Sequence, residues 1–484
     1  MSQTSFTQPT PGEPPVDLTN VQGDVIYGLP KTFEHFFFFT IVKPDTFKEN
    51  LSSLQFTTSD DIVKAREAIL GLKAKTPGER LQLKLLNVAF SQKGLDALGI
   101  EGDLNDEAFT KGQLQDALAL GDAPAMHGDP NKPNWKPAYF ERIDGVFLAA
   151  GDCFTRTVEV LNDALNKLQG SVKEVYRLNG NTRPGDQRKN EHFGWLDGVS
   201  NPLIRGVPRP PNVPEGQGKV DPGVILLGQT GDYQKHTKNP RLRPKWAFEG
   251  SIMVFRELQQ LVPEFDYFLE KNPYPVPLPP GIGKEVQGSR FMGRWKNGVP
   301  IELSPTSDDP RYLALDKINN FDFPQAPGDA GQEACPYSSH IRKMRPRSDI
   351  PVAEQEATRI NRKGITYGPE VQPDEQSERT TMYERGLAFV CYQSNMSENG
   401  FRLLQMGWAN NTHFLKAEKH MTIGYDPIIG QGNGLQRERN TAYRQDGSSI
   451  VLPADWVVPR GGEYFFTPSI KALKSVFAGK PYPE

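Results

Sequence analysis

Hydrophobic residues follow two patterns along this chain, one with the period of a strand and one with the spacing of a helix face. In the N-terminal part, apolar runs predict strands at residues 33–42, 83–90, 145–150 and 172–178. Between the last two strands, one helix face is predicted by the spacing of Val158, Leu161, Leu165 and Leu168. Strands and helices in this order are typical of a ferredoxin-like α+β sandwich.

Strand patterns return after a loop-rich segment. They occupy residues 251–258, 386–393 and 463–468, with one helix expected after Leu261 and another after Asn395. We therefore predict an α+β protein of two ferredoxin-like domains, each an antiparallel sheet flanked by helices. The expected units are an N-terminal domain at 1–183, a loop-rich connector at 184–245 and a C-terminal domain at 246–484.

Composition and charge narrow the class of protein. The 484 residues carry a net charge of −3 and no basic run, which argues against binding nucleic acid through its phosphates. The apolar run at Phe36 to Phe39 is far shorter than the roughly 20 residues that span a membrane, so no membrane partner is expected. Three distant cysteines without a CxxC pair indicate neither a disulfide framework nor a zinc site.

The localisation of the protein is a choice between secretion and the cytoplasm. The first residues lack a basic-then-apolar signal. We expect a secreted protein whose signal is absent from this chain, with a cytoplasmic protein as the alternative. Glycosylation sequons occur at Asn50, Asn395 and Asn410, about as many as chance gives in a chain of this length, so they do not decide between the two.

The segment EHFGWLDGVSNPLIRG, residues 191–206, places Asp197 in a glycine-containing turn beside Trp195 and Leu196. Glycines allow the tight turn, and the apolar neighbours favour burial. One interpretation is an aspartate that caps its own loop, which the residues alone favour. The other is a carboxylate held for proton transfer.

A second segment, CPYSSHIRKMRPR, places His340 before a run of cations that includes Arg342. A lone histidine is more often structural than a ligand, and the cations also fit a solvated basic loop. An iron-ligating imidazole followed by arginines would, however, hold both the iron and the propionates of a haem.

Farther along, INRKGITYGPE places Arg362 at the start of a predicted strand. An arginine and a carboxylate in a haem pocket can cleave peroxide together, because the carboxylate moves a proton and the guanidinium stabilises the developing negative charge. A surface ion pair is an equally good interpretation of Arg362 alone. The chain has no HExxH, GxSxG, Walker or GxGxxG motif, so zinc-protease, hydrolase, phosphoryl-transfer and nicotinamide chemistry lack their usual signals.

Taken together, six ordered segments resemble the dye-decolorising peroxidases, and most closely the fungal branch. These segments are VQGDVIYG, FGWLDG, CPYSSHIRK, INRKGITYGPE, GLAFVCYQSN and GYDPIIGQ. The resemblance implies two ferredoxin-like domains with one haem b per chain in the second. Many relatives carry paired arginines where this chain has Arg362 and Lys363.

The resemblance also implies roles at matching positions. Asp197 becomes the distal acid–base, Arg362 the distal arginine and His340 the axial ligand of the haem iron. We select Asp426 as the acceptor of the His340 Nδ1–H, with Glu418 in reserve. Leu387 and Phe389 are expected to narrow the distal pocket, and Arg342 to contact the cofactor.

The function expected from this resemblance is a haem peroxidase that uses hydrogen peroxide to oxidise phenols, dyes and other bulky aromatics in one-electron steps. One alternative keeps the haem fold but acts mainly on manganous ion. The other is a haem-binding or transport protein with incidental peroxidase activity. A monomer or homodimer is expected.

A narrow pocket would require electrons to leave through the protein. Trp408 ends a predicted helix and precedes a polar run, so we expect one ring edge inside and one near water. Tyr367 follows Arg362 by five residues and is the second candidate. Simple packing of the helix end is an equally good interpretation of Trp408.

Overall fold

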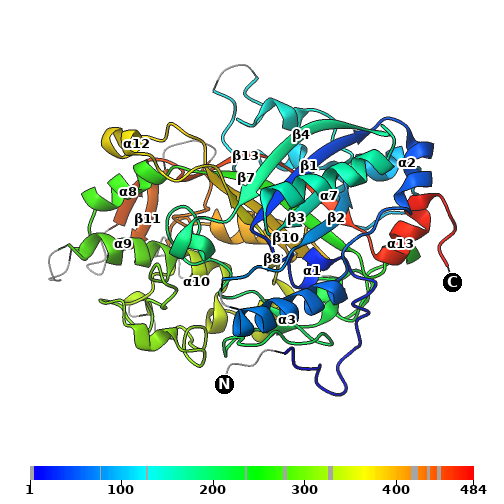
Figure 1. Cartoon of the computed structure of the whole chain (residues 1–484). Coiled ribbons are helices and arrows are strands. Elements are labelled where there is room, and N and C mark those ends of the chain that lie inside the picture. The colour runs from blue at the N-terminus through cyan, green and yellow to red at the C-terminus, as the bar shows by residue number, and fades with distance from the viewer. Residues whose placement is uncertain are drawn as a thin grey trace.

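The computed structural model of the chain describes residues 5–76, 78–126, 129–234, 237–275, 281–324, 331–415, 423–432, 437–443 and 449–483. Within these residues, the main sheet has the strand order β7-β13-β2-β3-β1-β4-β9-β10-β8, and β7 also pairs with β10. That extra pairing closes the sheet into a barrel, which lies at the centre of Figure 1. Its strands are β1 Phe33–Ile41, β2 Lys84–Phe90, β3 Gly145–Gly151, β4 Val172–Asn181, β7 Ser251–Gln260, β8 Asn361–Arg362, β9 Ile365–Tyr367, β10 Gly386–Gln393 and β13 Val457–Thr467.

The seven strands predicted from apolar runs are confirmed, and the two halves of the barrel have equivalent strand orders. The N-terminal half reads β2-β3-β1-β4 and the C-terminal half reads β13-β7-β10-β9. The expectation of two sheets needs correction, because the halves join where Phe466 pairs with Phe90 and Gly180 pairs with Tyr367. Unpaired sheet edges leave backbone N–H and C=O groups unsatisfied, and closure removes those edges.

Aromatic side chains from both halves fill the barrel. The rings of Phe36 and Phe38 on β1 lie 5.0 Å and 4.9 Å from that of Phe255 on β7. Phe38 also lies 6.2 Å from Phe465 on β13. The alternate residues Phe37 and Phe39 belong to the outer core beneath the helices. The apolar run of β1 is therefore buried on both faces, which explains its lack of polar alternation.

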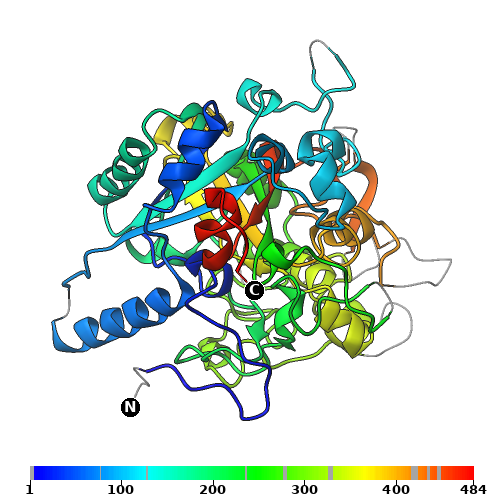
Figure 2. The same ribbon diagram turned by 90° about the vertical axis from the view of Figure 1, so that its right-hand side faces the viewer.

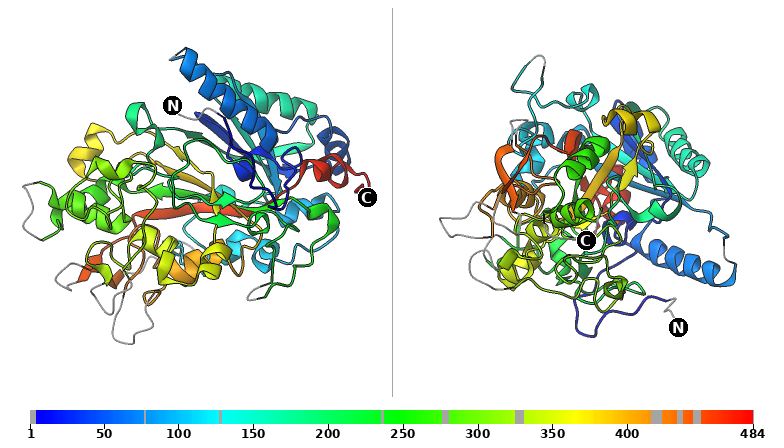
Figure 3. Two further views of the ribbon diagram at one scale, coloured as in Figure 1. Left: turned by 90° about the horizontal axis from the view of Figure 1, so that it is seen from below. Right: turned by 90° about the vertical axis from the view of Figure 1, so that its left-hand side faces the viewer.

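Helices cover the outside of the barrel. In Figure 1, α8, α9 and α12 lie at the opposite end of the molecule from α2 and α13. The long α3 begins at a capping box formed by Thr58 and Asp61 and extends away from the barrel, as Figures 2 and 3 show. The longer helices are α2 Pro44–Leu51, α3 Ser59–Lys75, α7 Phe154–Lys167, α8 Val262–Lys271 and α9 Gly283–Met292.

Short elements complete the described fold. The short helices are α1 Gly23–Ile26, α4 Gln92–Ala97, α5 Glu107–Lys111, α6 Gln113–Asp116, α10 His340–Met344, α11 Val352–Ala357, α12 Pro373–Glu378 and α13 Ile470–Lys474. The remaining strands are β5 Leu203–Ile204, β6 Lys219–Val220, β11 Arg437–Tyr443 and β12 Ser449–Leu452. Among the described helices, none has both the length and the apolar character needed to cross a bilayer.

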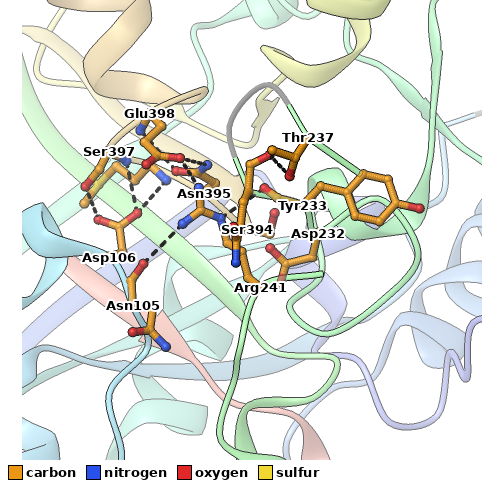
Figure 4. Close-up of polar contacts among 12 residues, drawn as sticks. Asn105, Asp106, Asp232, Tyr233, Thr237, Arg241, Ser394, Asn395, Ser397 and Glu398 are labelled. Atoms are coloured by element: carbon orange, nitrogen blue, oxygen red, sulfur yellow. Dashed lines mark hydrogen bonds and ion pairs between the residues drawn. The ribbon is translucent and has the colours of Figure 1, made fainter. Parts of the chain in front are cut away.

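A polar network joins the segment at Asp106 to the loop after β10 (Figure 4). The Asp106 carboxylate accepts backbone hydrogen bonds from Met396 and Ser397 at 2.8 and 3.0 Å. Asn395 is 7 % exposed, and its side-chain oxygen accepts the Glu398 N–H at 3.1 Å. The Nδ2 atom to which a sugar would be linked belongs to this buried side chain and donates to Glu398 at 3.4 Å, so the sequon is covered in the folded protein.

Candidate active site

The distal loop is organised by Glu191, a residue that the sequence analysis did not select. Its carboxylate accepts the backbone N–H groups of Phe193 at 2.9 Å and Trp195 at 2.8 Å. Gly194 adopts φ 102°, a region that disfavours a side chain, so the turn requires glycine. The Glu-x-x-Gly spacing carries little signal in one sequence, because the hydrogen bonds depend on the Glu191 side chain folding back over its own loop.

Asp197 leaves this loop with one carboxylate oxygen occupied. Its Oδ1 accepts the Gly198 N–H and the Arg362 guanidinium, each at 2.6 Å. No described residue donates to Oδ2, and the side chain is 37 % exposed, so Oδ2 is available from the adjoining cavity. Burial raises the pKa of Asp197, but Arg362, the Gly198 N–H and nearby His340 outweigh burial and leave the pKa below its ordinary value.

Arg362 is held through its backbone. Asn201 accepts the Arg362 N–H at 3.2 Å and donates to the Arg362 carbonyl at 3.1 Å, as a neighbouring strand would. The preceding residue, Asn361, donates to the carbonyls of Val25 and Ile26 at 2.8 Å each. The N-terminal VQGDVIYG segment therefore supports the strand that carries Arg362.

His340 occupies the first position of α10 and faces Asp426. The Nδ1–H of His340 donates to Asp426 Oδ2 at 2.8 Å, and Oδ1 accepts the N–H groups of Ile428 and Ile429 at 2.8 and 3.0 Å. Burial raises the pKa of Asp426, but His340 and the two N–H groups outweigh it, so the pKa is lowered. Asp426, the residue selected from the sequence, thus lies where it accepts the His340 Nδ1–H. Glu418, the reserve candidate, lies outside the described residues.

One cavity brings these groups together, and it is called the central cavity below. Its lining includes Asp197, Arg362 and His340. Leu387 and Phe389 also line it, as expected from the sequence. With Nδ1 committed to Asp426, the imidazole has Nε2 left for a ligand, and no described residue contacts that nitrogen through a hydrogen bond.

The structure does not bring Arg342 to the central cavity. Its buried guanidinium donates to Asp349 at 2.7 and 3.0 Å and to the carbonyls of Gly331 and Cys335 at 2.7 Å each. Residues two apart on a helix do not share a face, so Arg342 points away from the side that His340 presents.

Two other arginines, unlike Arg342, reach the central cavity. Arg345 and Arg359 line the central cavity and form no ion pair within the described chain. Burial lowers the pKa of Arg345 to about 10 and that of Arg359 to about 9. Arg345 shares the Asn319 side-chain oxygen with Arg294 and Arg347, at 3.0, 3.1 and 2.8 Å. Three guanidinium groups around one neutral oxygen favour an anion beside them.

The two electron-transfer candidates lie outside the lining of the central cavity. Trp408 is 3 % exposed and stacks on Phe414 at 4.6 Å, so the expected ring edge near water is wrong. It belongs to the π-helix Leu403–Ala409, whose carbonyl at Trp408 accepts the buried Lys343 ammonium at 3.1 Å. Tyr367 is 4 % exposed inside the barrel and donates to Glu384 at 3.3 Å.

Comparison with known proteins identifies similar chains along almost the whole length. Residues 20–184 match the family described as the DyP dimeric alpha+beta barrel domain. A dye-decolorizing peroxidase of Mycena epipterygia is 39 % identical and aligns over 96 % of this chain and 87 % of its own length. One from Mycetinis scorodonius is 40 % identical, with 96 % and 88 % covered.

Solved structures are similar over the same range. A point mutant of the dye-decolorizing peroxidase from Pleurotus ostreatus is 41 % identical, with a TM-score of 0.88 over 96 % of this chain and all of that chain. The crystal structure of a decolorizing peroxidase from Auricularia auricula-judae is 36 % identical, with a TM-score of 0.83 and the same coverage.

Proposed function

The chain belongs to the dye-decolorizing peroxidase family of haem enzymes and has that family's α+β barrel, and on this premise we propose that Asp197, Arg362 and His340 form its peroxidase site. One haem b per chain would occupy the central cavity, and His340 Nε2 would hold its iron. When bound, the haem supplies the redox centre through which electrons pass, one at a time, from aromatic substrates to hydrogen peroxide.

The residues present fit this cofactor. A single imidazole, oriented by a buried carboxylate, lies in a largely apolar cavity that is also lined by Arg345 and Arg359, neither of which forms an ion pair with a described carboxylate. Arg345 and Arg359 would hold the propionates, in place of Arg342. The Asp426 carboxylate would keep the Nδ1 proton and make Nε2 a stronger donor to iron.

Asp197 moves the proton in this proposal. Its unoccupied Oδ2 would take a proton from peroxide and return it to the leaving oxygen, while Oδ1 stays fixed by Gly198 and Arg362. Arg362 would stabilise negative charge on the departing oxygen. The observation that carries this proposal is the 2.6 Å Asp197–Arg362 pair at the same cavity as His340.

Leu387 and Phe389 would keep bulky aromatics from this cavity, so electrons from dyes would travel through the protein. Trp408 and Tyr367 remain the proposed carriers. Because both are buried, each would need a further group between it and a dye at the surface.

The equivalent strand orders support two ferredoxin-like units, which we assign to the units at 1–183 and 246–484 with the connector at 184–245 between them. Secretion and a monomeric or homodimeric state also belong to the proposal. Manganous ion is the weaker substrate candidate, because the described residues contain no cluster of three or more His, Cys, Asp or Glu side chains suited to a metal ion.

Steady-state oxidation of a small phenol and an anthraquinone dye by the haem-loaded protein tests the proposal. Peroxide-dependent turnover of both, with loss of both in Arg362→Leu, is the expected result. A haem-transport protein with incidental activity would show slow turnover that Arg362→Leu leaves unchanged, and that outcome would overturn the assignment.

A further inference from the structure

A second cavity adjoins the central cavity on the other side of the distal pair, and it is called the side cavity here. The residues that line both cavities, and thus form the wall between them, are Glu191, Asp197, Gly198, Arg362 and Leu387. The side cavity has a volume of about 810 Å³, within the range of small-molecule sites. Nothing in the proposed peroxide chemistry uses most of this space.

The charge of the side cavity is unbalanced. Eight basic side chains line it against four carboxylates in the described chain. Among the carboxylates, Asp197 is paired with Arg362, and Asp152 with Arg156. Lys31 is neutralised by Glu34 from outside the lining, but the remaining basic side chains still outnumber the carboxylates of the cavity, which favours an anionic ligand.

Two of the basic groups are half-buried and have few hydrogen-bond partners. The stem of Lys363 packs against Gly28 at the cavity wall, and its ammonium forms no hydrogen bond or ion pair with a described residue. Burial, together with Arg66, Lys31 and Arg362, outweighs the opposing effect of Asp24 and lowers the pKa of Lys363 to about 7. Arg66 donates through Nη2 to the carbonyls of Tyr27 and Gly28, but its buried Nε has no partner.

Apolar side chains form another part of the wall. Leu29, Ile69, Leu81 and Leu83 line the same cavity as Lys363 and Arg66. A ligand that satisfies both surfaces carries one anionic group and one flat apolar body. An aromatic carboxylate has this shape, whereas a small inorganic anion would leave the apolar wall uncovered.

We propose that the side cavity is a binding site for single-ring aromatic carboxylates, with the carboxylate at Lys363 and Arg66 and the ring against the apolar wall. The site deepens the proposed function by naming an acidic aromatic substrate class, and in that respect it rests on that function. Binding itself depends only on residues of the side cavity.

Calorimetric titration of the haem-loaded enzyme with benzoate and with the uncharged isostere benzamide tests the proposal. Benzoate should bind at least tenfold more tightly than benzamide, and Lys363→Gln should remove most of that preference while leaving benzamide binding unchanged. Lys363→Arg should restore it. Lys75→Gln is the matched control, because Lys75 is exposed on α3, outside the lining of the side cavity.

Equal binding of the two ligands, or a benzoate preference that survives Lys363→Gln, would overturn the inference. The same preparations are checked for peroxide-dependent phenol turnover. Intact turnover with no benzoate preference rejects the side-cavity site alone, whereas absent turnover with an intact, Lys363-dependent preference rejects the peroxidase assignment alone.

Discussion

At the scale of single residues, the site depends on how each polar atom is occupied. Oδ1 of Asp197 is fixed by two donors, and Oδ2 is left for chemistry. Nδ1 of His340 is bound by Asp426, and Nε2 is left for the iron of the proposed haem. The residue types could be selected from the sequence. Which atom of each side chain is hydrogen-bonded and which is left open could not be predicted, because it depends on contacts between positions up to 165 residues apart.

Asp197→Asn keeps the size of the side chain and removes its capacity as a base. We expect peroxide cleavage to slow by a factor on the order of 10² or more, measured by rapid-mixing absorbance. In the unchanged enzyme the lowered pKa of Asp197 keeps the carboxylate ionised as the pH falls to its ordinary value of 3.8, and the rate should decline only below that pH. A near-normal rate in the variant would transfer the role to Arg362 or to solvent.

His192 gives a residue-scale prediction about stability. Burial lowers its pKa from 6.5 to about 4, and its Nε2–H donates to the Tyr367 carbonyl at 2.9 Å. Because the folded state disfavours the charged imidazole, stability is complete above pH 6.5 and is lost as the pH falls toward 4. The loss amounts to roughly 3 kcal/mol at about 1.4 kcal/mol per pKa unit.

His192→Gln keeps an amide donor for that carbonyl and removes the titration. Denaturant unfolding at pH 7 and pH 4 should therefore show a smaller difference for the variant than for the unchanged protein. The same pH dependence in both would assign the acid loss to other groups.

At the scale of elements, Arg362, the proposed distal arginine, lies on a two-residue strand. β8 ends at Arg362, and β9 begins at Ile365 after an interruption at Lys363 and Gly364. A side chain at Gly364 would approach the Ala388 carbonyl to 2.7 Å, so the interruption requires glycine. The alternation of the sequence predicted a strand here, but not its break, which depends on close approach of β10.

The Asn201 side chain hydrogen-bonds to the N–H and carbonyl of Arg362, as a neighbouring strand would. Asn201→Ala should leave the overall fold intact but loosen Arg362, with peroxide cleavage slowed about tenfold and the KM for a small phenol little changed. Asn201→Asp retains the acceptor for the Arg362 N–H and should recover part of the rate. Neither change would be seen if Asn201 only filled space.

Most regular elements followed from the hydrophobic pattern, whereas the π-helix at Leu403–Ala409 did not. Apolar spacing predicted a helix after Asn395. The wider π-helical turn, and the Lys343 ammonium that donates to the carbonyls of Trp408 and of Asn411 beyond the helix end, depend on tertiary contacts. The prediction that Trp408 is half-exposed was wrong because Phe414 stacks on its ring at the end of the helix.

At the scale of the whole molecule, closure of the barrel places the N-terminal half against the site. Asn361 binds the carbonyls of Val25 and Ile26, and the side cavity has walls from both halves. Patterns within each half predicted its strands, but the joining pairs, Phe466 with Phe90 and Gly180 with Tyr367, link distant positions that no local pattern identifies.

Electron transfer to large substrates is also a property of the whole molecule. Trp408→Ser should spare oxidation of small phenols but sharply lower turnover of bulky dyes, measured on both substrates with the same haem-loaded preparation. Tyr367→Phe keeps the ring and removes the phenol, and serves as the comparison. Equal loss on both substrate classes, or none on either, would exclude Trp408 as a carrier.

The central claim is that haem binds between His340 and the Asp197–Arg362 pair. The most direct measurement is the absorption spectrum of the purified, haem-loaded protein before and after one equivalent of hydrogen peroxide, compared with that of His340→Ala. The account predicts a Soret band that changes on mixing, and loss of the haem or of its normal axial ligation in the variant. A colourless protein, or a His340→Ala variant with an unchanged spectrum and peroxide response, would contradict it.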